Sequence, residues 1–261
     1  MAYWNGEALV ALDHCDPNQT TVLAADSWLV TDGTALAIDL HRERFSSAVD
    51  QQSAGTVDAT AFWDAALEEI PREGNQFPRV ELQTYRDGMR LVARQRTAPR
   101  LGSTVTLATH EGADPRTQPL VKGPASDALL RARTAAQARG ADEAVLLSED
   151  GFVAEGAYSA IVWWKGNTLC LPSREIPRVD SVTVRSVAAL ATALGVELHY
   201  ESARPDQLGH LEIWALSALH GIRLVTRWID GPTAAAEPGR LQLWRSRLHR
   251  LRKPLPTPSA G

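Results

Sequence analysis

Residues 122–156 read KGPASDALLRARTAAQARGADEAVLLSEDGFVAEG, and this stretch decides the fold of the second half of the chain. Ser126-Asp127 can cap a helix whose apolar residues recur at helical spacing, and Gly140 is typical of a helix end. The apolar residues 144–147 predict a strand, and Asp150-Gly151 predicts a turn into the β-rich segment 152–164. The stretch therefore predicts a lysine, a helix and then paired strands.

Helices and strands continue to alternate beyond this stretch. Gly166-Asn167 is a turn signal, and the residues from 181 to 194 predict a helix that ends at Gly195. Strands are predicted at 196–200, 212–219 and 222–229.

Hairpins dominate the first half of the chain. Strand-like segments at 21–30 and 35–40 flank Asp32-Gly33, and those at 79–85 and 89–96 flank Asp87-Gly88. Two helices are expected among these strands, and one of them lies between the hairpins, with Asp58 as its N-cap and Pro71 at its end. The mixture of hairpins and helices predicts an α+β fold.

A length of 261 residues suits two domains. The proline-bearing stretch 113–119 has no periodic apolar face, so it predicts a linker between an N-terminal α+β domain, 1–112, and a C-terminal domain, 120–232. Residues 233–261 predict a basic C-terminal helix and tail, with the helix at 240–253 docked by an apolar stripe and its basic face in solvent. The end of the tail, from Pro254, is expected to fray.

The bulk composition favours a small-molecule substrate. A formal net charge of -4 gives no electrostatic reason to expect nucleic acid or an acidic membrane as partner. The only two cysteines, Cys15 and Cys170, lie far apart in the sequence and offer neither a disulfide framework nor a metal-ligand spacing, which fits a reducing cytoplasm. We found neither a signal peptide nor an apolar run long enough to span a bilayer, so we expect a cytoplasmic protein without a bound metal.

Longer motifs carry the functional information, since the short motifs of nucleotide, zinc and serine-hydrolase sites are absent. In class IV aminotransferases a lysine precedes a helix, a Gly-Ala-Asp-Glu-Ala strand follows, and a Val-x-Glu-Gly motif comes next. Lys122, residues 140–144 and residues 153–156 resemble these motifs in the same order. Further segments that resemble the family are His41–Phe45 (its His-x-x-Arg motif), 163–169, 182–185 and 218–223.

The resemblance covers about residues 30 to 230 and implies a two-domain, fold type IV enzyme that depends on pyridoxal 5′-phosphate (PLP). Such enzymes combine a small N-terminal α/β sandwich with a larger C-terminal pseudo-barrel domain that binds the cofactor. In the family the cofactor lies between the domains and a neighbouring subunit completes the pocket. The resemblance therefore also implies a homodimer.

The same resemblance assigns roles at the cofactor. Lys122 would supply the amine that forms a Schiff base with the aldehyde and later shuttles a proton. Glu155 would pair with the pyridine nitrogen and keep it protonated, the alternative being a solvated strand end. Arg44 would grip the phosphate through parallel hydrogen bonds, the alternative being an ion pair with Glu43 or Asp39.

The rest of the phosphate site would come from a helix start and a turn. Thr183 and Val184 precede the second helix of this half, where backbone N–H groups favour an anion. Ser217 and Ala218 would complete the site. Val182 stands where the family has glycine, and the threonine is displaced by one position.

The substrate contacts are less regular, because residues 23–30 replace a glycine-rich run that shapes the pocket in many relatives. Trp28 could cover a cyclic substrate or could belong to the core. Arginines on the predicted strand 89–96 lie where relatives bind a substrate carboxylate. The expected substrate residues are Ser27, Trp28, Arg94, Arg96 and Arg223.

Three functions follow. The motifs look closest to the 4-amino-4-deoxychorismate lyase branch, in which a PLP enzyme releases pyruvate from an amino substrate and leaves 4-aminobenzoate. The same residues would serve a D-amino-acid or branched-chain aminotransferase, where Lys122 moves a proton from the substrate to the cofactor. A PLP-free relative that keeps the fold for binding or assembly is the third alternative.

Overall fold

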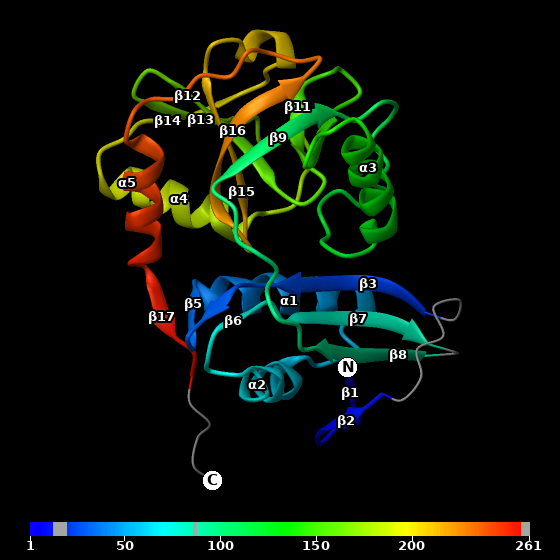
Figure 1. Ribbon diagram of the computed structural model, residues 1–261. Coiled ribbons are helices and arrows are strands. Elements are labelled where there is room, and N and C mark those ends of the chain that lie inside the picture. Colours follow the sequence, from blue (N-terminus) through cyan, green and yellow to red (C-terminus); the bar gives the residue numbers. More distant parts are fainter. Residues whose placement is uncertain (13–19, 86–87, 257–261) are drawn as a thin grey trace. The chain divides into compact units, whose positions relative to one another are not determined.

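The computed structural model describes residues 1–12, 20–85 and 88–256 (Figure 1). Two compact units are present. Unit 1 comprises the described residues of Met1–Arg100, Val121–Pro124 and Leu251–Gly261, and unit 2 comprises Leu101–Leu120 and Ala125–Arg250. The stretch 113–119, which we expected to link the domains, thus belongs to unit 2, whereas the short segment with Lys122 belongs to unit 1.

Unit 1 contains an antiparallel five-stranded sheet in the order β2-β1-β8-β7-β3. Its strands are β1 (Ala2–Trp4), β2 (Leu9–Ala11), β3 (Thr20–Ser27), β7 (Arg79–Tyr85) and β8 (Gly88–Arg94). The hairpin predicted around Asp87-Gly88 is confirmed by the pairing of Tyr85 with Gly88, while Asp87 itself lies outside the described residues.

Two helices share the core of unit 1. They are α1 (Ile38–Ser53) and α2 (Thr60–Glu68). Phe45 of α1 and Trp63 of α2 are almost completely buried, and their rings lie 6.0 Å apart. Burying a side chain such as Phe45 contributes roughly 1.5–3 kcal/mol. Asp58 accepts a hydrogen bond from the Thr60 amide at 2.8 Å, one residue before the N-cap position that the structure assigns to Ala59.

A small second sheet in unit 1 has the order β17-β5-β4-β6. The predicted turn at Asp32-Gly33 is confirmed, because both residues have positive φ (44° and 71°), as a two-residue hairpin turn requires. The predicted strand at 35–40 is wrong beyond Leu36, since the chain turns at Ala37 and α1 begins at Ile38. The strands are β4 (Val30–Thr31), β5 (Thr34–Leu36), β6 (Asn75–Gln76) and β17 (Arg252–Pro254).

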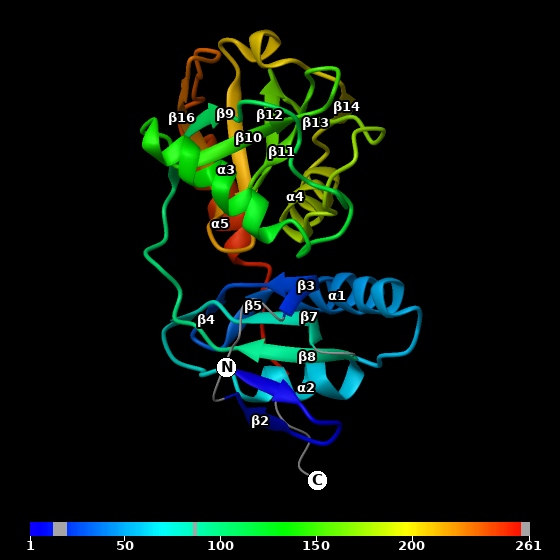
Figure 2. The same cartoon turned by 90° about the vertical axis from the view of Figure 1, so that its right-hand side faces the viewer.

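Unit 2 is built on a mixed eight-stranded sheet in the order β11-β10-β9-β16-β15-β12-β13-β14, which curls rather than lying flat (Figures 1 and 2). A cluster that includes Val145, Trp163 and Val225 forms the apolar core of this sheet. The strands are β9 (Thr104–Thr109), β10 (Glu143–Leu147), β11 (Val153–Gly156), β12 (Ala160–Lys165), β13 (Thr168–Pro172), β14 (Leu198–Glu201), β15 (Glu212–Ser217) and β16 (Gly221–Ile229).

The helices of unit 2 lie close to their predicted positions, but the N-cap of the first is Ala125, without a side-chain hydrogen bond, instead of the predicted Ser126-Asp127. Helix α3 (Ser126–Ala138) packs on β9 and β10 and is followed by Gly140 with φ 85°. Helix α4 (Val182–Ala193) has Ser181 as its N-cap, and a short 3₁₀ helix, η2 (Pro205–Leu208), follows β14. The predicted α+β class is confirmed, and the segment 152–164 forms two strands, β11 and β12.

The C-terminal helix α5 (Arg240–His249) is shorter than predicted. Residues 252–254 form β17 on β5 instead of continuing the helix, and the Leu255 amide donates to the Gly33 carbonyl at 2.8 Å. Fraying from Pro254 is therefore wrong for residues 254–256. The basic face is not merely solvated either, because Arg245 donates to the His220 carbonyl at 3.0 Å. In the described parts of the chain we found no helix with the length and apolarity needed to cross a membrane.

Candidate active site

Lys122 is anchored in unit 1 by its backbone. Its carbonyl accepts a hydrogen bond of 2.7 Å from the Ala25 amide of β3. Gly123 makes this approach possible, since a Cβ atom at its position, where φ is 132°, would lie 2.8 Å from backbone atoms of Ala24 and Ala25. The backbone of Lys122 is thereby held against β3 at Ala25, the residue that precedes Asp26.

Asp26 is the centre of a buried charged cluster. Its two carboxylate oxygens accept hydrogen bonds from Nε and Nη2 of Arg44 at 2.8 and 2.7 Å, and Nδ1 of His41 lies 2.9 Å from Oδ1. Burial alone would raise the pKa of Asp26, but the Arg44 and His41 contacts outweigh it and hold this pKa well below its usual range. Arg44 thus pairs with Asp26, whereas the sequence suggested Glu43 or Asp39 as its ion-pair partner.

His41 links this cluster electrostatically to Lys122. Burial lowers the pKa of His41; the Asp26 carboxylate opposes the shift, and the positive charges of Arg44 and Lys122 add to it. Lys122 therefore lies within electrostatic range of the cluster. The imidazole is held neutral at neutral pH, while the Asp26 carboxylate stays ionised.

A second charged cluster lies on β7 and β8 around Glu81. Arg79 donates to one oxygen of Glu81 at 2.5 Å, and Arg94 donates to the other at 2.9 Å. Arg96 donates to the Phe77 carbonyl at 3.1 Å, and its Nη2 lies 3.4 Å from the Ser27 hydroxyl. Two guanidinium groups thus bind one buried carboxylate and a third contacts Ser27, which gives an arginine cluster (Arg79, Arg94, Arg96).

Strand register explains how this cluster forms. Ser27 of β3 pairs with Arg79 of β7, which pairs with Arg94 of β8, so the three side chains form a row on one face of the sheet. The sequence indicated Ser27, Arg94 and Arg96 but not Arg79. The predicted hairpin of β7 and β8 places Arg79 opposite Arg94, and the pairing of β3 with β7, which are far apart in the sequence, adds Ser27 to the row.

Trp28 lies in the core of unit 1. Its side chain is 1% exposed, with its ring centroid 4.7 Å from that of Trp63 and 5.9 Å from that of His41. Its indole nitrogen has no hydrogen-bond partner in the part of the chain that the structure describes. This placement agrees with the alternative that Trp28 belongs to the core. Of the two neighbouring residues Ser27 and Trp28, Ser27 is the one that contacts the arginine cluster.

Glu155 belongs to unit 2, where it contacts an arginine that the sequence did not indicate. Nη1 of Arg116 donates to the Glu155 carboxylate, and the Val179 amide donates to the same oxygen at 3.4 Å. Arg116 is buried, and its Nε and Nη2 bind Asp114 at 2.9 and 2.6 Å. Glu155 is therefore a buried carboxylate in an ion-pair network, not a solvated strand end.

Arg116 has no sequence signal that could have identified it. It lies in an irregular, polar stretch that we assigned to a linker, and its partners come from β11 and from the loop before α4. Burial alone would lower its pKa, but the contacts with Asp114 and Glu155 outweigh burial and raise this pKa. The guanidinium is therefore a permanent charge beside Glu155.

The predicted phosphate residues of unit 2 lie at a helix start and at a strand turn. The Ser181 hydroxyl caps α4 by accepting a hydrogen bond of 3.3 Å from the Val184 amide. The Val184 amide, which we expected to bind phosphate, therefore already has a local partner. Thr183 is buried in the first turn. The Ser217 hydroxyl accepts from the His220 amide at 3.1 Å, which closes the turn that contains Ala218.

Arg223 is buried near this turn, with an incomplete set of partners. Its Nη2 lies 3.6 Å from Glu143, and its Nε has no hydrogen-bond partner within the described residues. Register places Arg223 opposite Ala215, on the same sheet face as Ser217. Burial raises the pKa of Glu143 against the opposing charge of Arg223, and it lowers the pKa of His220 to about 4, with the charge of Arg223 adding to the shift.

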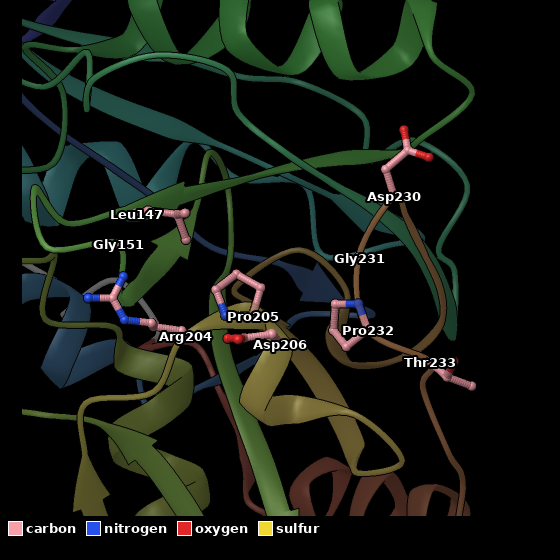
Figure 3. Close-up of a pocket in the computed structure, with 9 residues that line it drawn as sticks. All are labelled: Leu147, Gly151, Arg204, Pro205, Asp206, Asp230, Gly231, Pro232 and Thr233. Carbon is pink, nitrogen blue, oxygen red and sulfur yellow. The ribbon is translucent and has the colours of Figure 1, made fainter.

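A cavity of about 720 Å³ lies elsewhere in unit 2 (Figure 3). Arg204, Asp206 and Asp230 supply its charged lining, and the Arg204 guanidinium lies 4.9 Å from the centre of the Phe152 ring. None of the predicted site residues lines this cavity. The remaining lining residues are Leu147, Gly151, Pro205, Gly231, Pro232 and Thr233.

Comparison with known proteins places the chain in a family. The family model described as amino-transferase class IV matches residues 23–228, so the chain belongs to the class IV aminotransferases. Membership of this family makes it a PLP-dependent enzyme of the aminotransferase and lyase class. The structure supplies matching chemistry: an anchored lysine, a buried carboxylate, a capped helix start and a buried guanidinium whose Nε has no partner among the described residues.

Individual relatives support the same fold. A branched-chain aminotransferase of Thermoproteus uzoniensis superposes with a TM-score of 0.82 at 18% identity, covering 96% of this chain and 94% of that one. A hypothetical aminotransferase of Mycobacterium tuberculosis in its PLP-bound form gives 0.77 at 19% identity, covering 87% of each chain. These similarities confirm the fold type IV architecture.

One curated relative matches in sequence. It is an aminodeoxychorismate lyase of Bacillus subtilis (strain 168), 41% identical over 56 residues. This match spans 22% of the present chain and only 19% of the relative's length.

Proposed function

We propose that this enzyme is a PLP-dependent lyase that acts on 4-amino-4-deoxychorismate, releasing pyruvate and leaving 4-aminobenzoate. The arginine cluster is the observation that carries this proposal. Such a substrate has one carboxylate on its ring and another on its enol ether side chain. Arg79 and Arg94 form ion pairs with Glu81, and Arg96 adds a third guanidinium beside Ser27, so the cluster offers charged donors suited to carboxylates. The match with a stretch of an aminodeoxychorismate lyase adds support.

The proposed cofactor residues come from both units. In unit 1, the Lys122 amine would bond to the aldehyde and Arg44 would contribute to phosphate binding. In unit 2, Glu155 would face the pyridine nitrogen, and the residues of the helix start and the turn (Thr183, Val184, Ser217, Ala218) would bind phosphate oxygens. When bound, PLP supplies an electron sink for the bond-breaking step.

The protein residues would then perform binding and proton transfer. Arg94 and Arg96, with Arg79, would hold the carboxylates, and Ser27 would contact the substrate beside them. Arg223 would serve as a further contact. The Lys122 amine, freed when the substrate's amine takes its place at the aldehyde, would remove the proton from the carbon that carries the substrate's amine. The carbon–oxygen bond to the side chain breaks as the ring becomes aromatic, and the departing enolpyruvate takes up a proton to become pyruvate.

A direct assay tests the proposal. Purified enzyme with PLP is mixed with 4-amino-4-deoxychorismate and no amino acceptor, and pyruvate and 4-aminobenzoate are measured. We expect both products in equal amounts from the wild type and neither from Lys122→Ala. Failure with this substrate, together with transfer from a D-amino or branched-chain amino acid to 2-oxoglutarate, would establish the aminotransferase alternative instead.

Cofactor attachment is tested separately. PLP should give a violet-region absorption band that borohydride bleaches, and mass spectrometry should locate the reduced cofactor on Lys122. Absence of the band would point to a non-catalytic homologue. We also propose a cytoplasmic homodimer, for which sedimentation equilibrium should give twice the monomer mass of 28.4 kDa.

A further inference from the structure

We propose that Asp114 and Arg116 are positioning residues that set the charge felt at Glu155 and, through it, the protonation of the cofactor's pyridine nitrogen. The inference rests on the role proposed for Glu155. It assigns a function to two residues that lie outside the family motifs in the sequence.

The geometry divides one guanidinium between two carboxylates. Arg116 directs Nη1 to Glu155, while Nε and Nη2 bind Asp114. The Arg116 side chain is only 2% exposed, compared with 10% for Glu155 and 24% for Asp114. The Arg116–Glu155 contact is therefore shielded from solvent, where charge coupling is strong.

Further groups face these residues, and they are fixed. Arg178 is electrostatically coupled to Glu155, but its guanidinium donates to the carbonyls of Pro172, Ser173 and Ile176 at 2.8, 2.5 and 2.9 Å. The Val179 amide binds Glu155 directly, and His110 is coupled to Asp114. Arg116 also donates to the Pro177 carbonyl at 3.3 Å, which helps to fix its plane. Among these contacts, Arg116 is the cation that two carboxylates share.

The sharing of Arg116 between Glu155 and Asp114 determines how readily Glu155 accepts a proton. A full positive charge beside a carboxylate favours its ionised form and lowers its pKa. Asp114 offsets part of the Arg116 charge, which raises the proton affinity of Glu155. A pyridine nitrogen facing Glu155 is protonated more readily as that affinity rises. Arg116 and Asp114 therefore act on the nitrogen in opposite directions.

The first experiment uses the cofactor-free full-length protein. Selective ¹³C labelling of glutamate carboxyl groups, with Glu155→Gln to assign the signal, gives the pKa of Glu155 by NMR titration. Arg116→Gln should raise this pKa by about one unit or more, the effect expected from removing an opposite charge within 4–6 Å. Asp114→Asn should lower it, and Arg116→Lys, which keeps the charge, should leave it close to the wild type. A Glu155 pKa that moves in the same direction in Arg116→Gln and Asp114→Asn would overturn the proposal, because a merely structural disturbance would do the same.

The second experiment measures the pyridine nitrogen with ¹⁵N-labelled PLP. The ¹⁵N chemical shift should indicate most protonation in Arg116→Gln, less in the wild type and least in Asp114→Asn. An unchanged shift across the three proteins would overturn the link to the cofactor. Opposite shifts of the Glu155 pKa in a protein that binds no PLP would support the charge coupling and reject the proposed function.

Discussion

Asp26 is the residue on which the charged groups around Lys122 depend. It is completely buried, yet the Arg44 and His41 contacts keep it ionised. Removing its charge by Asp26→Asn leaves the Arg44 guanidinium without its carboxylate. Breaking a buried ion pair in this way costs about 3–5 kcal/mol. We expect the unfolding free energy at pH 7, measured by urea denaturation, to fall by an amount of this order.

The pH dependence of the same variant follows from the direction of the pKa shift. Because the folded-state pKa of Asp26 lies below the unfolded value of about 4, its stabilising effect is fully present above that pH and is lost as the pH falls through the folded-state pKa. Asp26→Asn should therefore lose less stability on acidification than the wild type. Asp58→Asn is the comparison, because the Thr60 hydrogen bonds lower the pKa of Asp58 at a fully exposed position; it should change the acid dependence in the same direction but by less than Asp26→Asn.

Arg94 tests substrate recognition at a single residue. Its Nε binds Glu81, and it lies in the row with Ser27 and Arg79. A hydrogen bond to a charged group contributes about 1.5–3 kcal/mol, so Arg94→Gln should raise KM for a dicarboxylate substrate about tenfold or more. Arg90→Gln on the same strand, where the arginine contacts Gln83 and Tyr85, should leave KM near the wild-type value. Equal changes in KM in the two variants would contradict the role of Arg94 in substrate binding.

At the scale of elements, β17 shows how a short C-terminal strand contributes to unit 1. Leu255 follows β17 and is 5% exposed, packed in the core of unit 1. Leu255→Ala should lower the unfolding free energy by about 2–3 kcal/mol, near the lower end of the range for buried leucines. Leu251→Ala provides a matched control, because Leu251 is 43% exposed. Denaturant titration should separate the two variants, and similar losses in both would contradict the placement of β17.

Elements with local signals were predicted well from the sequence. Positive φ at Asp32 and Gly33, the start of α4 beside Ser181 and the glycine after α3 all depend on residues that specify the backbone locally. The start of helix α1 was not predicted from the sequence, because Ile38–Leu40 continues an apolar run that resembles a strand. Its helical signal is the buried stripe His41, Phe45 and Val49, which becomes distinct only once the chain has turned at Ala37.

At the scale of the whole molecule, the sequence predicted the family motifs but not the contacts between distant segments. Ser27 reaches the arginine cluster through the pairing of β3 with β7, and Arg116 reaches Glu155 from an irregular stretch. Lys122 lies in a four-residue segment of unit 1, Val121–Pro124, whose Lys122 carbonyl binds Ala25, although the chain on both sides of this segment belongs to unit 2. Such contacts follow from tertiary packing, which local patterns do not encode.

Cofactor binding should stabilise the folded protein as a whole. A ligand that binds only the folded state adds about 2.7 kcal/mol of stability at a concentration one hundred times its Kd. PLP should therefore raise the melting temperature of the wild type by several degrees, measured by calorimetry. Pyridoxal, which lacks the phosphate, should raise it less if the helix start at Ser181 and the turn at Ser217 bind that group. Lys122→Ala should respond less to PLP because the covalent bond is lost, and an equal response in this variant would show that Lys122 is not the attachment site.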